Sequence, residues 1–293
     1  MIREFAFIGA PYDGAATLGW PGARYAPDEI RRNLEWMKRR VEDGRIYWLD
    51  RDEVVPFDAN QLIDAGDAAV VPHDLALTLA AVRAATHEQA LQDRVPLVVG
   101  GDDSILFPAV EGVHDAVGGS VGIVHFDAHL DLMDESGDQG RHSQSSGMRR
   151  ALELERVDPA RSVQVGVRNF NYPSSKAFID SVGLTEISAA RVHSAGAAAI
   201  SEQISDAVAD VDHVFVAVDI DVLDPANAPG VGWHEPGGLT SRQLIDLLVD
   251  LAPRARGLCL NEVNPMTDHG SQTTILAANL LFQFVVAASQ GQE

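Results

Sequence analysis

Apolar positions along the chain fall into six short runs, each bounded by glycine, proline or polar residues, and such runs predict β-strands. The runs cover 4–9, 95–99, 121–126, 162–167, 214–218 and 257–260. Within them nearly every position is apolar, instead of every second one. That pattern is typical of a parallel sheet whose two faces are both covered by helices.

Helical patterns separate these runs. Pro27, followed by Asp28 and Glu29, predicts a helix start, because proline and acidic residues are favourable in a first turn. Thr240 to Gln243 is a capping box in front of leucines at helical spacing. Further helices are expected over 73–92, 147–155, 197–210 and 273–286. The last is apolar nearly all round, so we expect it in the core or in a subunit contact.

Strands and helices alternate along the chain, and Asp64 to Asp67 is interpreted as a turn between them. No linker, composition break or internal repeat interrupts the alternation, so we expect one α/β domain over residues 1–293. In a parallel sheet of this kind, ligands bind at the carboxyl ends of the strands. The polar motifs that follow the strands are therefore the candidates for function.

Five acids and one histidine follow three of the predicted strands. They are Asp103, Asp127, His129, Asp131, Asp219 and Asp221. In extended backbone, residues two apart point to the same side, so each motif should present its side chains together. Converging carboxylates repel one another unless cations lie between them. Because carboxylate and imidazole are ligands of divalent metals, the pattern predicts a metal site.

Composition narrows the possible partners. The formal charge of −21 argues against nucleic acid and anionic membrane surfaces, and it suits a cationic ligand. The one cysteine, Cys259, excludes an intrachain disulfide and fits a reducing cytoplasm, where we expect the protein to be located. No stretch approaches about 18 uninterrupted apolar residues, so we expect no membrane span, and the first residues lack the apolar segment of a signal peptide.

Eight motifs are spread along nearly the whole chain: Ile8–Gly14, Pro21–Arg24, Gly100–Asp102, Asp127–Asp131, Asp219–Pro225, Pro229–Gly230, Glu235–Leu239 and Glu262–Pro265. In this order they resemble the motifs of the ureohydrolase (arginase–agmatinase) family. The resemblance implies a three-layer α/β/α fold with a mostly parallel eight-stranded sheet, assembled as trimers or hexamers. It also implies two divalent metal ions, usually manganese and sometimes nickel. The implied reaction is hydrolysis of a guanidino or related amidino C–N bond in a small cationic substrate, commonly with release of urea.

The resemblance also implies roles for the candidate metal ligands. Asp127 and Asp219 would bridge the two ions. His129 and Asp221 would then complete the ligands of one ion, and Asp131 would bind the other. Ions held in this way would activate one water for attack on the amidino carbon of the substrate.

Asp103 departs from the family motif, which has a metal-binding histidine at this position. Five carboxylates around two divalent ions leave a surplus negative charge, which should weaken the activation of a metal-bound water. A weak or empty first metal site is therefore an open alternative. More oxygen ligands also favour manganese over nickel. His125, within the strand, is interpreted as a core residue or as a residue that supports the ligands.

Three further residues would act on the substrate. Glu262 matches the family position that pairs with the guanidinium, a planar group that a carboxylate binds well. Gln144 stands where related agmatinase-like sequences have a proton-shuttling histidine, and glutamine cannot exchange a proton near pH 7. His142 could replace it or could be a solvent-facing loop residue. Trp20 and Trp233 could line a pocket, or could serve ordinary packing.

Two hypotheses remain open at this point. The first is a cytoplasmic, metal-dependent hydrolase of a guanidino or amidino compound, built as a homotrimer or homohexamer. The second is a non-catalytic or weakly active subunit that assembles with an active paralogue, for example in a guanidine or biguanide hydrolase. The second is suggested by the two replaced histidines, since both positions carry specific chemistry. Metal content and turnover of the purified chain would separate them.

Overall fold

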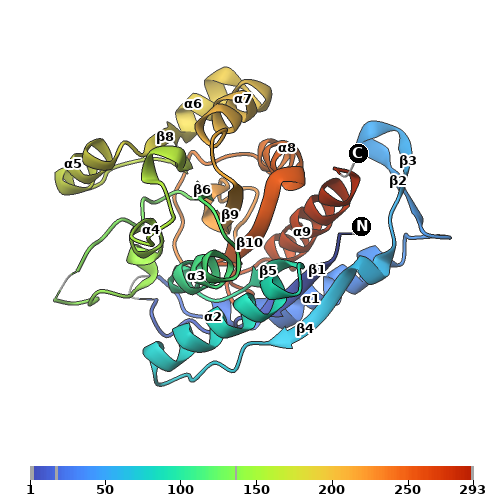
Figure 1. The fold of residues 1–293 in the computed structure, drawn as a ribbon, viewed down its shortest axis with the longest axis horizontal. Coiled ribbons are helices and arrows are strands. Elements are labelled where there is room, and N and C mark those ends of the chain that lie inside the picture. The colour runs from blue at the N-terminus through green and yellow to red at the C-terminus, as the bar shows by residue number, and fades with distance from the viewer. Residues whose placement is uncertain (1–2, 17–18, 136, 292–293) are drawn as a thin grey trace.

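The strands of one eight-stranded sheet form the centre of the protein (Figure 1). They are β1 Phe5–Gly9, β4 Leu62–Asp67, β5 Val95–Val99, β6 Val121–Phe126, β7 Val163–Val167, β8 Thr185–Ser188, β9 His213–Asp219 and β10 Ala255–Asn261. The computed structural model describes residues 3–16, 19–135 and 137–291, so both ends of the expected domain, 1–2 and 292–293, lie outside the described part. The strand order is β4-β1-β5-β10-β9-β6-β7-β8, and neighbouring strands are parallel.

Helices cover both faces of this sheet. They are α1 Ala26–Lys38, α2 Leu75–Leu91, α3 Leu106–Ala116, α4 Gly147–Leu152, α5 Pro173–Val182, α6 Ala189–Ala195, α7 Ala197–Ala207, α8 Ser241–Leu251 and α9 Gln272–Gln290. In one buried cluster, the helices α1, α6, α7, α8 and α9 pack against one side of the strands. In a second cluster, α2, α3, α4 and α5 pack against the other side. Successive strand residues alternate between the clusters, as Leu97 and Val98 do. The predicted three-layer α/β/α fold is confirmed.

The four central strands bring distant parts of the chain together. β5, β10, β9 and β6 are consecutive neighbours in the sheet. Because parallel strands end at the same edge, the segments that follow them meet there. Asp103 follows β5, Glu262 follows β10, Asp219 ends β9 and Asp127 follows β6. The candidate site is therefore formed by segments that follow neighbouring strands of the sheet, although these segments are distant along the chain.

All six predicted strands are present, but the sequence pattern does not predict β4, β8 or a separate antiparallel hairpin, β2 Arg45–Trp48 and β3 Glu53–Pro56. The interpretation of Asp64 to Asp67 as a turn is wrong, because these residues are the last four of β4, which pairs with β1. β4 and β8 are the edges of the sheet, and most of β4 is exposed, so no continuous apolar run marks it. Arg31 of α1 lies 2.9 Å from Asp64 and 2.5 Å from Asp67, and these ion pairs compensate the acidic edge.

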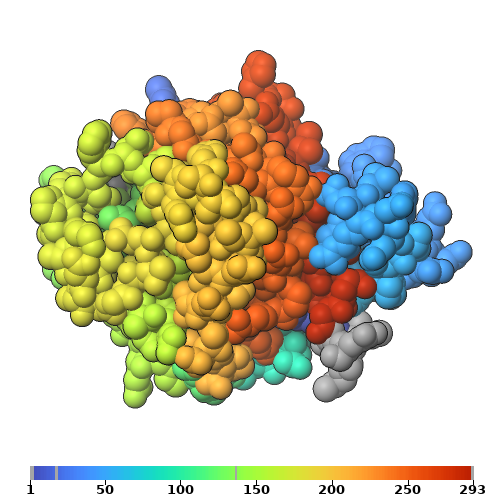
Figure 2. Space-filling model, turned by 90° about the horizontal axis from the view of Figure 1, so that it is seen from above, coloured from blue at the N-terminus to red at the C-terminus, as the bar shows by residue number. Residues whose placement is uncertain are grey.

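The predicted helix starts are confirmed. Pro27 lies in the first turn of α1, and Thr240 forms a capping box with Gln243 at the start of α8. The final helix, α9, continues past the predicted end at 286 to Gln290. It has the length and hydropathy of a membrane span, but 67% of the relevant window is buried inside the fold, as in a core helix. Figure 2 shows the hairpin, in blue, at one end of the face that α6 and α7 (yellow) and α8 (orange) cover.

Candidate metal centre

Two carboxylates at the strand ends each accept a hydrogen bond from the backbone N–H two residues further on. Oδ1 of Asp127 accepts from His129 at 2.6 Å, and Oδ1 of Asp219 accepts from Asp221 at 2.8 Å. The backbone is not extended there, since β6 ends at Phe126 and a 3₁₀ turn follows β9. The expectation that strand alternation aligns these side chains is therefore wrong. Local Asx turns bring them together instead, and each leaves a second carboxylate oxygen available for other partners.

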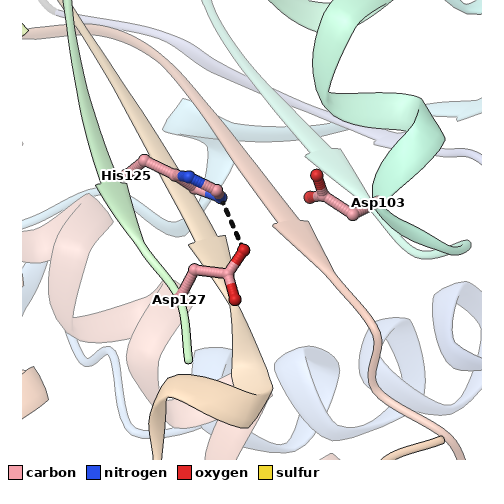
Figure 3. Close-up of side chains that lie close together, drawn as sticks. All are labelled: Asp103, His125 and Asp127. Carbon is pink, nitrogen blue, oxygen red and sulfur yellow. Dashed lines mark ion pairs between the residues drawn. The ribbon is translucent and has the colours of Figure 1, made fainter. Parts of the chain in front are cut away.

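The strand ends gather two groups of metal-ligating atoms that share one residue. Asp103, His125 and Asp127 offer atoms that all lie within 4.8 Å of one another (Figure 3). Asp127, His129 and Asp221 form a second group with the same maximum separation. Nδ1 of His129 lies 3.1 Å from Oδ2 of Asp221 and 3.4 Å from Oδ1 of Asp127. Asp127 therefore lies between two candidate cation positions, which suits a bridging ligand.

Asp131 and Asp219 border these groups without belonging to either of them in the described part of the chain. Burial raises the pKa of both carboxyl groups well above the usual range, and neighbouring acids, Asp127 among them, raise it further. Asp131 has a left-handed backbone, with φ of 48°, which is unfavourable for a residue other than glycine. Such strain is concentrated at functional sites, where the surrounding structure imposes it.

The net effect of burial and the neighbouring charges is to raise the pKa values of Asp103 and His129 and to lower that of Asp127. Burial raises the pKa of Asp103 well above its usual range, and Asp131 and Asp127 add to this effect. Burial acts to lower the pKa of His129, but Asp221 and Asp127 outweigh it and raise that pKa to about 12. The two neighbouring imidazoles lower the pKa of Asp127 against the effect of its burial. Positive charge is thus strongly favoured here, and a divalent cation would compete with protons for these atoms.

Two buried carboxylate oxygens have no aligned hydrogen-bond donor among the described residues and can face a cation. Oδ2 of Asp103 has no such partner, and Oδ2 of Asp127 has only the ion-pair contact with Nε2 of His125 at 3.1 Å. Asn261 donates a hydrogen bond to the other oxygen of Asp103, Oδ1, at 2.9 Å. Gly147 keeps the space beside Asp103 open, since a Cβ there would lie 2.6 Å from Oδ2. Unpaired buried anionic oxygens are costly unless a cation binds them, so the residues fit a divalent metal.

Glu262 lies directly beside the ligand groups. Its Oε1 accepts a hydrogen bond of 2.9 Å from the backbone N–H of Asp103, and its own N–H donates to the carbonyl of Gly101 at 2.9 Å. Like Asp131 it has a left-handed backbone, with φ of 61°. Burial raises the pKa of Glu262 well above its usual range, and the charge of Asp102 raises it further. A bound cation would favour the ionised form of this carboxyl group.

Glu235 is a neighbour of the site that the sequence did not reveal. Its Oε1 lies 3.7 Å from Nε2 of His129 and accepts a hydrogen bond of 3.0 Å from the Trp233 indole. The Asn169 amide donates to its other carboxylate oxygen. The residue lies in an irregular loop whose sequence gives no sign of which side chains turn toward the strand ends. Trp233, half-exposed, is thereby connected through Glu235 to the candidate metal ligands.

The two candidate proton-transfer residues lie in the segment before α4. The ring of His142 packs against Phe107, with 5.7 Å between the ring centroids, and borders a hollow formed mainly by α2 residues. Burial lowers the pKa of His142, and the charges of Arg150 and Arg141 lower it further. The backbone N–H of Gln144 donates to the carbonyl of Ala15 at 3.4 Å. The roles of His142 and Gln144 in proton transfer stay predictions.

The fold and the acid-rich centre define an arginase-like α/β/α protein, and comparisons with known proteins agree. The model of the arginase family matches residues 3–287. Proclavaminate amidinohydrolase of Streptomyces clavuligerus is 34% identical over 293 residues, covering 97% of this chain and 89% of that protein. Guanidinopropionase of Pseudomonas aeruginosa is 33% identical, and the match covers 96% of this chain and 86% of that protein. The chain therefore belongs to the arginase family, as its resemblance to ureohydrolases implied.

Solved structures show the same relationship. The structure of the Streptomyces clavuligerus proclavaminate amidinohydrolase matches with a TM-score of 0.85 and 30% identity, covering 99% of this chain and 93% of that one. A formiminoglutamase structure from Trypanosoma cruzi shares the fold at a TM-score of 0.86 and 22% identity, covering 99% and 95%. The match extends over nearly the whole length in both cases, so the fold assignment does not depend on the site motifs alone.

Proposed function

We propose that this protein hydrolyses a guanidino or related amidino C–N bond in a small cationic compound, with two divalent metal ions as cofactors. The observation that carries the proposal is the pair of ligand groups that share Asp127 at the meeting point of the central strands. Membership of the arginase family supports it, since the named relatives are an amidinohydrolase and a guanidinopropionase.

The donor set suits manganese. The residues that would hold the ions are Asp103, Asp127, His129, Asp131, Asp219 and Asp221. A centre dominated by carboxylate oxygens favours Mn²⁺ over Ni²⁺. The Trypanosoma cruzi formiminoglutamase, whose fold this chain shares, was solved with Mn²⁺. When bound, such ions supply Lewis acidity and lower the pKa of water toward about 7.

Glu262 is the residue that would bind the guanidinium or amidinium group. Its carboxylate is fixed beside Asp103 by the hydrogen bond from that backbone N–H, so it is held close to the ligand groups. A carboxylate matches the fork-shaped donors of a guanidinium, and the charges attract. Glu235, 3.7 Å from His129, adds a second negative charge next to the same groups. Both acids favour a cationic substrate.

The charged side chains around this region also indicate which substrate tails fit. Arg24 is paired with Asp13, and the guanidinium of Arg168 donates to backbone carbonyls, including that of Glu235 at 2.7 Å. The Arg168 guanidinium is thus occupied by backbone carbonyls, and the charge of Arg24 is balanced by that of Asp13. An amine or an uncharged tail suits the region around Glu235 and Trp233 better than an acidic tail does.

The proposal is tested by assaying the purified chain, loaded with MnCl₂, against agmatine, arginine, guanidinobutyrate and guanidine. We expect about two ions per chain, turnover of at least one compound, and loss of both in Asp127→Asn. Asp115→Asn, a change of an acid outside the site, is the matched control and should keep both. Two bound ions without turnover, with activity restored only by a co-expressed relative, would instead establish the non-catalytic subunit.

A further inference from the structure

His125 and Gln164 are a polar pair buried inside the sheet. They lie opposite each other on the neighbouring strands β6 and β7, and both are fully buried. Buried polar side chains in otherwise apolar strands are costly unless they are hydrogen-bonded, so each such pair needs an explanation. The members of this pair connect directly to the candidate metal centre, because His125 belongs to the group that contains Asp103 and Asp127.

The Gln164 amide determines which nitrogen of His125 carries hydrogen. Its Nε2 donates to the carbonyl of Leu130 at 2.6 Å and lies 3.2 Å from Nδ1 of His125. Turning the amide over would place two oxygens 2.6 Å apart at Leu130, so that contact fixes its orientation. An N–H then faces Nδ1 of His125, which must accept. The hydrogen of the neutral ring is therefore on Nε2.

Nε2 of His125 points to Asp127 (Figure 3). It lies 3.1 Å from Oδ2 of that residue, and neither atom has a well-aligned hydrogen-bond partner among the described residues. The contact is thus close but bent, so Oδ2 keeps a lone pair that can face a cation. Oδ1 is held by the backbone N–H of His129 at 2.6 Å. One oxygen of the shared carboxylate is thus held by a backbone hydrogen bond, and the other lies within ion-pair distance of the His125 ring.

We propose that His125 is a positioning residue for the shared carboxylate of Asp127, and that Gln164 fixes the tautomer that this requires. Because Nε2 carries hydrogen, His125 is not a metal ligand, although it lies among the ligand atoms. The sequence places the two residues close together, since His125 lies within β6 and Asp127 directly follows that strand. The inference rests on the metal centre of the proposed function.

Mn²⁺ binding tests this directly. His125→Leu and Gln164→Leu should each weaken Mn²⁺ affinity by about 10-fold or more, as loss of a residue that orients a ligand commonly does. His125→Gln keeps an N–H near the position of Nε2 and should bind Mn²⁺ more nearly like the wild type than like His125→Leu. The double variant His125→Leu with Gln164→Leu should bind no more weakly than His125→Leu alone, because Gln164 acts through His125.

Pulsed EPR of the Mn²⁺-loaded, ¹⁵N-histidine-labelled protein supplies a readout that does not depend on activity. We expect one directly coordinated imidazole nitrogen, from His129. His114→Leu is the matched control, because His114 is also buried and contacts a carboxylate, at 2.8 Å, away from the site. Melting temperatures of the metal-free variants separate loss of folding from loss of metal binding.

Two coordinated imidazoles, or loss of one ion in His125→Gln, would show that His125 is a ligand and overturn the proposal. Unchanged Mn²⁺ affinity in Gln164→Leu would also overturn it. If the wild type binds two ions without turnover, the proposed hydrolase function fails while this inference stands. If the wild type binds no Mn²⁺, both fail.

Discussion

The side-chain amide of Asn261 donates a hydrogen bond of 2.9 Å to Oδ1 of Asp103, while Oδ2 of the same carboxylate is buried without a partner among the described residues. Asn261 thus leaves one oxygen of Asp103 available as a ligand, at a position where the family resemblance implies a histidine. Asn261 in turn accepts the thiol hydrogen of Cys259 at 3.1 Å. Asp103 is therefore held by a chain of two hydrogen bonds that runs from Cys259 through Asn261.

Replacing Asp103 by histidine tests the departure that the family resemblance implies at this position. Asp103→His combined with Gln144→His removes one surplus negative charge and introduces a group that exchanges protons near pH 7. We expect a higher Mn²⁺ content and a higher kcat/KM than in the wild type, measured by elemental analysis and a urea assay. Asp115→His, outside the site, is the control. An unchanged Mn²⁺ content and activity would mean that the two positions are misassigned or that Asp103 is already a full ligand.

Glu262→Gln should separate substrate binding from metal binding. The amide oxygen can still accept the hydrogen bond from the backbone of Asp103, but the charge that attracts a guanidinium is lost. Removing one partner of a buried charge pair costs about 2 kcal/mol or more, so kcat/KM should fall by at least about 30-fold. The Mn²⁺ content should stay at the wild-type level. A variant that keeps its kcat/KM would exclude Glu262 from substrate recognition.

The negative charge of Glu235 predicts that the protein prefers a substrate with a positively charged tail. Agmatine and guanidinobutyrate have guanidino groups on chains of similar length, but one ends in an ammonium and the other in a carboxylate. We expect kcat/KM to be at least about tenfold higher for agmatine, which corresponds to about 1.4 kcal/mol of charge interaction. Glu235→Gln should narrow this ratio. A higher kcat/KM for guanidinobutyrate would contradict the charge argument.

Acid should weaken the anchoring of α9 through Asp268. Its carboxylate accepts hydrogen bonds from the backbone of Thr273 at 3.0 Å and Thr274 at 2.9 Å. Burial raises the pKa of Asp268, but these N–H groups outweigh it, and the pKa in the folded protein is lowered. The stabilisation is therefore present above the unfolded-state pKa, about 3.9, and is lost as the pH falls through the folded-state pKa.

Asp268→Asn should accordingly lower the free energy of unfolding at pH 7 by about 1 kcal/mol, after screening by solvent. The difference from the wild type should begin to shrink below about pH 3.9, the unfolded-state pKa, and should vanish below the lowered folded-state pKa, where both carry a neutral side chain. Urea denaturation at pH 7 and at pH 3.5 measures both values. Asp43→Asn, at an exposed position, is the control. An equal loss of stability at both pH values would show that the charge of Asp268 is not what stabilises α9.

The central strands and their acids could be predicted because each strand has a continuous apolar run that ends in a polar motif. β6 ends before Asp127 and β9 ends at Asp219, within a residue of the predicted ends. The edge strands β4 and β8 could not be predicted, because exposure to solvent on the edge removes the need for such a run. The sequence therefore indicates best those strands that are covered on both faces.

The residues that support the ligands were harder to predict for a different reason. Gln164, Asn261 and Glu235 act through contacts between segments that are distant in the sequence. Those contacts depend on the order β5-β10-β9-β6-β7, which the order of segments along the chain does not give. The candidate ligands could be proposed from the sequence because their spacing within each motif is local. Their immediate partners become visible only when the sheet is assembled.

Anomalous diffraction from crystals grown with MnCl₂ tests the central claim most directly. The account predicts two manganese peaks per chain at the carboxyl ends of β5, β6 and β9. Both ions should be bound to Asp127, and Asp219 should lie next to both. The absence of manganese at Asp127, or ions bound only elsewhere on the protein, would contradict it.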